Sequence, residues 1–109
     1  MPKFLILYRS TAEAGEQMAA ATPEQAQEGM QMWMKWAEKA GPALVDLGSP
    51  LGSSKMVGGS AQTGTPIGGF SVLDADSGEA VATLLEDHPH LHAPGAAIEV
   101  LEYLPMPGM

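Results

Sequence analysis

The alternation of apolar and polar positions divides the chain into four predicted strands and two predicted helices. Short runs of β-prone apolar residues predict the strands, and apolar residues spaced three or four apart predict the helices. The first run is apolar at every position, which is typical of a central strand covered on both faces. We expect strands at Phe4–Tyr8, Ala43–Leu47, Ile67–Leu73 and Ile98–Leu104, and helices at Pro23–Ala40 and Ser77–Glu86.

The longer helix carries clear start and stop signals. Thr22 is a capping residue, Pro23 occupies the first helical position and Gln25 the third, while Gly41-Pro42 ends the helix. At roughly 100° per residue its apolar arc covers about 200°, which is wider than the stripe that one sheet buries. We therefore expect a buried centre and a shoulder that contacts something else. The centre consists of Ala26, Met30, Trp33, Met34, Ala37 and Ala40, and the shoulder of Met32 and Trp36.

The third predicted strand has one face of small residues. Because side chains alternate along a strand, Phe70 and Val72 share one face, while Gly69, Ser71 and Leu73 share the other. Gly69 and Ser71 therefore leave space beside the sheet.

The order of the elements predicts an α+β fold. Two β-α-β halves in about 100 residues are typical of the ferredoxin-like split βαβ domain, an antiparallel sheet with both helices on one face. A chain of 109 residues has the length of a single domain, 1–109. The other sheet face is then bare, although the first strand is apolar on both faces. We expect a second copy of the chain to cover it in a homodimer, or the face to enclose a ligand.

Composition and charge exclude several classes of function. With 45% apolar and 17% charged residues the chain is globular in type, and its net charge of −8 with only five Lys and Arg argues against nucleic acid or anionic membrane as a partner. The absence of cysteine excludes disulfides and thiolate sites. No apolar run is long enough for a membrane span or a signal peptide, so we expect a cytoplasmic protein.

The three histidines lie in one short segment, Asp87-His88-Pro89-His90-Leu91-His92. If this segment is extended, the three imidazoles point to one side. Histidine is the usual general base at neutral pH, and a neighbouring carboxylate such as Asp87, Asp46 or Glu99 can orient it. The candidate catalytic residues are His88, His90 and Asp87. The alternatives are a polar loop in which His88 caps the preceding helix, or a metal site. We expect no metal, because no cysteine or H-E-x-x-H motif accompanies the histidines.

A ligand site is expected where this segment meets the Met32/Trp36 shoulder, over the small-residue face of the third strand. Tryptophan and methionine side chains suit a flat apolar or aromatic ligand, although core or dimer contact also explains them. At the end of the first strand a phenol and a guanidinium can meet a carboxylate or phenolate, or serve as a structural hydrogen bond and a surface salt bridge. The candidate ligand-binding residues are Met32, Trp36, Tyr8, Arg9, Gly69, Ser71 and His92.

Several short motifs follow one another along the chain in a characteristic order and spacing. They are Lys3–Tyr8, Trp33–Ala37, Leu44–Leu51, Gly68–Phe70, and His88–Leu91 with Ile98–Val100. Together they resemble the YCII-related (YciI-like, DGPF-domain) family of the dimeric α+β barrel superfamily. The resemblance covers nearly the whole chain, and it implies two ferredoxin-like sheets packed face to face in a homodimer.

The resemblance does not carry over a catalytic pair. Some members of the family use a His–Asp pair, with the His near the start of the first long helix and the Asp near its end. At these positions this chain has Gln25 or Ala26 and Glu38 or Lys39. The DGPF tetrapeptide is also missing, and the corresponding loop is Gly58–Gly64, with the sequence Gly-Gly-Ser-Ala-Gln-Thr-Gly. The chain's own histidines are therefore the residues to consider.

Two functions from different classes agree with the sequence. One is a cofactor-independent enzyme of the lyase or isomerase type that uses histidine-assisted proton transfer or elimination on a small aromatic or enolisable compound. The other is a non-catalytic dimeric module that binds such a compound or has an accessory role. The glycines Gly58-Gly59 and Gly68-Gly69 match neither common phosphate-binding motif, so we expect no nucleotide and no other cofactor.

Overall fold

The computed structural model describes residues 2–11, 19–52, 54–59, 64–93 and 95–107. All six predicted elements are present in these ranges, and none of the helices there is both long and apolar enough to cross a membrane. Two short 3-10 helices, η1 and η2, were not predicted. The elements are β1 (Lys3–Arg9), α2 (Pro23–Ala40), η1 (Gly41–Ala43), β2 (Leu44–Asp46), β3 (Ile67–Asp74), α3 (Gly78–Leu85), η2 (Pro89–His92) and β4 (Ala97–Glu102).

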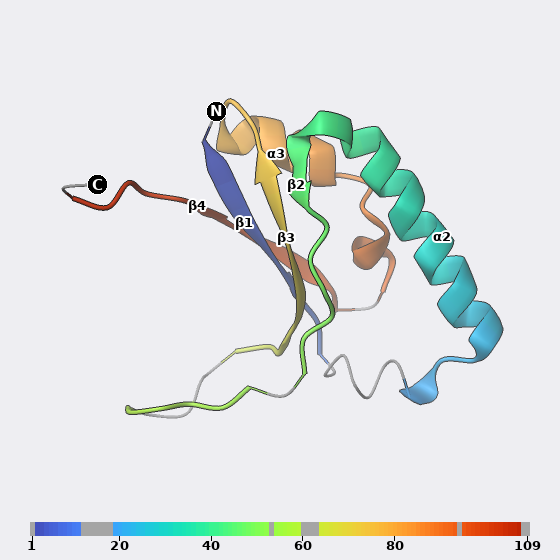
Figure 1. The fold of residues 1–109 in the computed structure, drawn as a ribbon. Helices are drawn as coiled ribbons and strands as arrows, with labels where there is room; N and C mark the ends of the chain where they lie inside the picture. The colour runs from blue at the N-terminus through green and yellow to red at the C-terminus, as the bar shows by residue number, and fades with distance from the viewer. Residues whose placement is uncertain (1, 12–18, 53, 60–63, 94, 108–109) are drawn as a thin grey trace.

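The four strands form one antiparallel sheet in the order β2-β3-β1-β4. Figure 1 shows α2 and α3 on the same side of this sheet. In the register of β1, Ile6 lies between Ser71 of β3 and Val100 of β4, so the apolar first strand is central, as predicted. The α+β class and the ferredoxin-like topology are confirmed.

The start of α2 has the predicted capping geometry. The backbone N–H of Gln25 donates to Thr22 Oγ1 at 3.1 Å, and the N–H of Thr22 donates to Gln25 Oε1 at 3.0 Å. This reciprocal pair satisfies two of the backbone donors that a helix start leaves without partners. At the other end, Gly41 has a φ of 55°, a left-handed value that favours glycine. Local sequence thus determines both ends of α2.

The core lies between the sheet and the two helices, but α2 does not bury the stripe that its sequence predicts. Met30 and Met34, expected at the centre of the buried arc, are 61% and 48% exposed, whereas Trp36 is only 4% exposed. The prediction for the two methionines is wrong, because Trp36, expected on the shoulder, packs in the core together with Ala40, which was expected there. The Trp36 indole N–H also donates to Leu84 O at 2.9 Å, which fixes this side of α2 against the end of α3.

No described helix covers the second face of the sheet (Figure 1). The register places Leu5 between Val72 and Leu101, on the face opposite to Phe4 and Ile6. Leu101 is 41% exposed on this face. The sheet therefore has one face buried by helices and one apolar face that is partly open.

Candidate functional site

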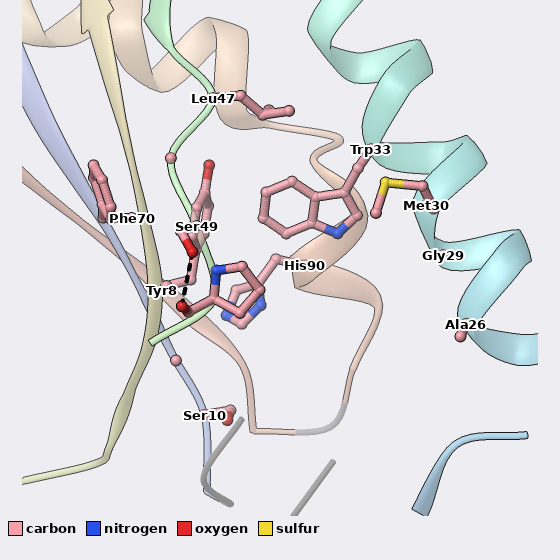
Figure 2. Close-up of a pocket in the computed structure, with 14 residues that line it drawn as sticks. Tyr8, Ser10, Ala26, Gly29, Met30, Trp33, Leu47, Ser49, Phe70 and His90 are labelled. Carbon is pink, nitrogen blue, oxygen red and sulfur yellow. Dashed lines mark hydrogen bonds between the residues drawn. The ribbon is translucent and has the colours of Figure 1, made fainter. Parts of the chain in front are cut away.

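A cavity of about 400 Å³ lies between the first half of α2 and the small-residue face of the sheet. Figure 2 shows Trp33 and Met30 reaching from α2 toward Tyr8, Ser49 and His90. None of the described residues that line the cavity carries a formal charge. They are Tyr8, Ser10, Ala26, Gly29, Met30, Trp33, Leu47, Gly48, Ser49, Pro50, Gly68, Gly69, Phe70 and His90.

Two glycines let the segment after β2 lie close to β3. Gly48 has a φ of 85°, and a Cβ on it would stand 1.7 Å from the carbonyl oxygen of Phe70, so no other residue fits there. Gly69 pairs with Pro50 in an isolated bridge, and a Cβ on Gly69 would stand 3.2 Å from Ser49 O. Residues 47–50 thus fill one part of the space predicted over the small-residue face. The remaining part is the cavity.

Tyr8 forms part of the cavity wall and is held by a buried hydrogen bond. Its hydroxyl lies 2.8 Å from Ser71 Oγ, and Ser71 in turn donates to Leu47 O at 2.6 Å. Because a serine has a single hydroxyl hydrogen and the carbonyl takes it, Tyr8 is the donor to Ser71. Burial raises the pKa of Tyr8 to about 12, although the Ser71 hydrogen bond acts in the opposite direction. Tyr8 is therefore a neutral phenol at physiological pH.

His90 is the one imidazole among the described residues that line the cavity. Its Nε2 lies 2.8 Å from the carbonyl oxygen of Arg9, and since a carbonyl only accepts, Nε2 carries the hydrogen. Nδ1 is therefore the ring nitrogen that can act as an acceptor, and it has no hydrogen-bond partner in the described part of the chain. The ring lies 5.3 Å from the Tyr8 ring. A backbone carbonyl thus selects one tautomer of His90, the one imidazole that lines the described part of the cavity.

His88 is fully buried beneath the cavity and does not line it. Its Nδ1 accepts the backbone N–H of His90 at 3.0 Å, so its hydrogen is on Nε2. Nε2 is buried without a hydrogen-bond partner among the described residues. Burial, with smaller contributions from the charges of His90 and His92, lowers the pKa of His88 to about 4. His88 is therefore neutral at physiological pH.

The segment is not extended, so the three imidazoles do not point to one side. Pro89–His92 form the 3-10 helix η2, and the His88 side chain caps the start of this turn. His88 is buried, His90 lines the cavity and His92 is exposed. Within the described ranges no three His, Cys, Asp or Glu side chains come together as a metal site would require.

A second, shallower hollow of about 320 Å³ contains the other part of the predicted site. Asp87 lies there, with its carboxylate 2.6 Å from Lys39 Nζ. The Lys39 hydrogen bond and charge lower the pKa of Asp87. The hollow is lined by Met32, Lys35, Trp36, Lys39, Asp87 and Pro89.

The geometry therefore brings together only part of the predicted site. Tyr8, Gly69 and His90 line the cavity, and Ser71 lies behind Tyr8, whereas Met32, Trp36 and Asp87 belong to the second hollow. Arg9 lines neither, since its guanidinium contacts Glu99 Oε1 at 2.7 Å and Thr65 O at 2.6 Å.

Sequence reasoning did not select the 47–50 segment or Gly29 as site residues. The Gly48-Ser49-Pro50 triplet after a strand is a turn signal, and such a turn beside small strand residues could have indicated the wall. Gly29 in the middle of a helix is the other available signal, because glycine there lowers helix stability and often has a packing reason.

Comparison with known proteins supports the fold. No family model matches the chain, and no curated protein matches it either. Among solved structures, it is similar to 5-chloro-2-hydroxyhydroquinone dehydrochlorinase from Burkholderia phenoliruptrix AC1100, in a complex with 2,5-dihydroxybenzoquinone. The TM-score is 0.54 at 20% sequence identity, over 94% of this chain and 93% of the other. At this identity the likeness concerns the fold.

Proposed function

We propose that the cavity binds a small, uncharged aromatic or enolisable compound and that His90 removes a proton from it without a cofactor. The observation that carries the proposal is the hydrogen bond of His90: its Nε2–H is fixed on the Arg9 carbonyl, which leaves Nδ1 as the ring nitrogen that can accept a proton. The reaction class is proton transfer or elimination, as in a lyase or an isomerase.

The shape and polarity of the cavity support this ligand class. A volume of about 400 Å³ accommodates a single-ring molecule. The rings of Tyr8 and Trp33 lie 4.8 Å apart at an interplanar angle of 76°, so a flat ligand can stack on one ring and present its edge to the other. No charged side chain among the described lining residues is available to compensate a buried ionic group, and an unpaired buried charge is costly.

The chemistry follows from the tautomer of His90. The substrate proton moves to Nδ1 while its electron pair stays on the substrate as an enolate or phenolate. That intermediate then takes a proton at another atom, or expels a leaving group. The positive charge on the protonated ring strengthens the Nε2–H bond to the Arg9 carbonyl. The structural neighbour is named as a dehydrochlorinase and was found with a dihydroxybenzoquinone, which agrees with this reaction class.

The proposal includes membership of the YCII-related family and a homodimer closed over the open sheet face. The sequence motifs support the family, and the likeness to the dehydrochlorinase fits the superfamily. The apolar side chains of Leu5, Leu7 and Leu101 on the face without helices support the dimer. The alternative function, a non-catalytic binding module, is favoured by the missing His–Asp pair of the family.

The binding part is tested by NMR titration with hydroquinone as the probe. The chain has two tryptophans, so their indole N–H signals serve as reporters. We expect a shift at Trp33, which lines the cavity, and little change at Trp36, whose N–H donates to Leu84 O. Gly29→Phe should abolish the shift by filling the cavity, and Gln31→Phe, at an exposed position of the same helix, should preserve it. A response at Trp36 alone would move the site to the second hollow.

The catalytic part is tested with His90→Gln. The amide N–H of glutamine can keep the bond to Arg9 O, but the variant has no base. We expect deuterium incorporation into cyclohexane-1,2-dione to fall at least about 100-fold, the usual range for a general base, while hydroquinone binding changes little. Equal exchange rates in the two proteins would leave a binding module as the function.

A further inference from the structure

We propose that His88 is a positioning residue that holds His90 in the tautomer and orientation needed for proton removal. This inference rests on the proposed function of His90. His88 contacts His90 through a hydrogen bond and contacts the cavity wall through its ring, without lining the cavity itself.

The hydrogen bond fixes the backbone that carries His90. His88 Nδ1 accepts the N–H of His90, two residues further on, as Asn and Asp side chains do when they start a turn. Pro89 between them has its φ fixed by its ring. The start of η2 is thereby determined by the side chain of His88, and His90 Nε2 meets the carbonyl of Arg9 from this position.

The ring of His88 supports the aromatic wall of the cavity. Its centroid lies 4.9 Å from that of Tyr8 and 4.5 Å from that of Trp33, which both line the cavity. It also lies 4.3 Å from the Trp36 ring in the core. One side chain therefore joins the core, the two aromatic walls and the backbone of the proposed base.

Histidine is the residue that combines these two contacts. Asparagine offers an acceptor to the His90 N–H but has no ring, and phenylalanine offers a ring but no acceptor. The unpartnered, buried Nε2 of His88 costs free energy that an apolar residue would avoid. The fold keeps a histidine here despite this cost, and the same ring supplies the Nδ1 acceptor for the His90 N–H. A pKa of about 4 keeps Nδ1 unprotonated, and so able to accept, at physiological pH.

Two variants separate positioning from simple packing. His88→Phe keeps a ring among Tyr8, Trp33 and Trp36 but removes the acceptor, whereas His88→Asn keeps an acceptor but removes the ring. The readout is the tautomer of His90, taken from the ¹⁵N chemical shifts of its ring without any ligand, together with the melting temperature and deuterium exchange into cyclohexane-1,2-dione. If His88 acted through packing alone, the variant with the lower melting temperature would also show the larger change in the His90 tautomer and in the exchange rate.

We expect the two variants to rank in opposite order by tautomer and by stability. In His88→Phe, His90 should lose its fixed Nε2–H tautomer and exchange should fall at least tenfold, with the smaller loss in melting temperature. In His88→Asn, the tautomer should be retained although the melting temperature falls further. Unchanged ¹⁵N shifts of His90 in His88→Phe would overturn the inference.

A measurement on the unmodified protein covers the case in which neither variant folds. The long-range ¹H–¹⁵N spectrum should show His88 with Nδ1 unprotonated and Nε2 protonated, and the opposite tautomer would overturn the inference. The tautomer of His90 is measured without ligand, so this result tests the positioning role of His88 separately from the proposed catalytic function of His90. If the tautomer depends on His88 but the native protein catalyses no exchange, the proposed function fails and the positioning of His90 by His88 stands.

Discussion

Tyr8 donates its hydroxyl hydrogen to Ser71, and the two side chains come from neighbouring strands, β1 and β3. Ser71 passes the interaction on by donating to Leu47 O, just after β2. Both hydrogen bonds run in the same direction, from Tyr8 to Ser71 to Leu47 O, because each hydroxyl has a single hydrogen and a carbonyl oxygen can only accept. Tyr8, which lines the cavity, is thus tied to the segment at residues 47–50, which also lines it.

The direction of these bonds predicts unequal effects of two substitutions. Ser71→Ala removes the partner of both Tyr8 and Leu47 O in a buried place, and it should lower the free energy of unfolding by roughly 2–3 kcal/mol. Tyr8→Phe leaves Ser71 bonded to Leu47 O and should cost only about 1 kcal/mol. Urea unfolding of both variants measures the difference. A larger loss for Tyr8→Phe would mean that the bonds run the other way.

Tyr8 should ionise only near pH 12, with a matching loss of stability in alkali. The raised pKa means that the unfolded chain releases the tyrosine proton first, so stability is lost as pH rises from about 10 to about 12. The loss amounts to roughly 2–3 kcal/mol for a shift of this size. Absorbance at the phenolate band in a Tyr103→Phe variant, in which Tyr8 is the only tyrosine, measures the ionisation. Ionisation near pH 10 in the folded protein would contradict the burial of this phenol.

His88 should make the protein less stable in mild acid. Because its pKa is lowered to about 4, the unfolded chain takes up the imidazole proton first as pH falls below about 6.5. The neutral His88 ring therefore contributes roughly 3 kcal/mol to the free energy of unfolding above pH 6.5, and this contribution is lost as the pH falls to about 4. Urea unfolding at several pH values, compared with His88→Phe, isolates it. The same pH dependence in both proteins would assign the acid sensitivity to other groups.

The open sheet face should form a dimer interface. Light scattering is expected to give about twice the chain mass of 11.4 kDa. Leu101→Glu, on this face, should shift the protein toward the monomer, because a carboxylate would be buried against apolar side chains. Leu104→Glu is the control, since Leu104 is 79% exposed and lies beyond β4. A native mass near 11.4 kDa at micromolar concentration would refute the dimer.

Two glycines of the cavity should respond in opposite ways to alanine. Gly48→Ala should abolish folding or cost several kcal/mol, because its Cβ would overlap the Phe70 carbonyl at a positive φ. Gly29→Ala has nothing within 4 Å of the added Cβ and should stabilise the helix by roughly 0.5–1 kcal/mol. Melting temperatures of the two variants test this. A tolerated Gly48→Ala would mean that residues 47–50 do not lie against β3.

Local signals in the sequence determined the elements of this fold. The Thr22 capping box and Gly41 set α2 at the predicted residues, because both ends depend on neighbours within a few positions. The alternation in β3 identified the face that carries Gly69 and Ser71, and the order of the elements gave the topology. The last strand was less well bounded: β4 ends at Glu102, two residues before the predicted Leu104.

Tertiary structure decided which side chains meet. Periodicity showed an apolar arc on α2 but not its rotation, and the contact of Trp36 with the end of α3 turned Met30 and Met34 outward. The histidine segment had the right residues, yet the turn at Pro89 sends His88 into the core and His90 into the cavity. The wall at residues 47–50 depends on the close approach of Gly48 to Phe70. Spacing along the chain fixes only local geometry, whereas the contacts of Trp36 with Leu84 and of Gly48 with Phe70 join residues more than 20 positions apart.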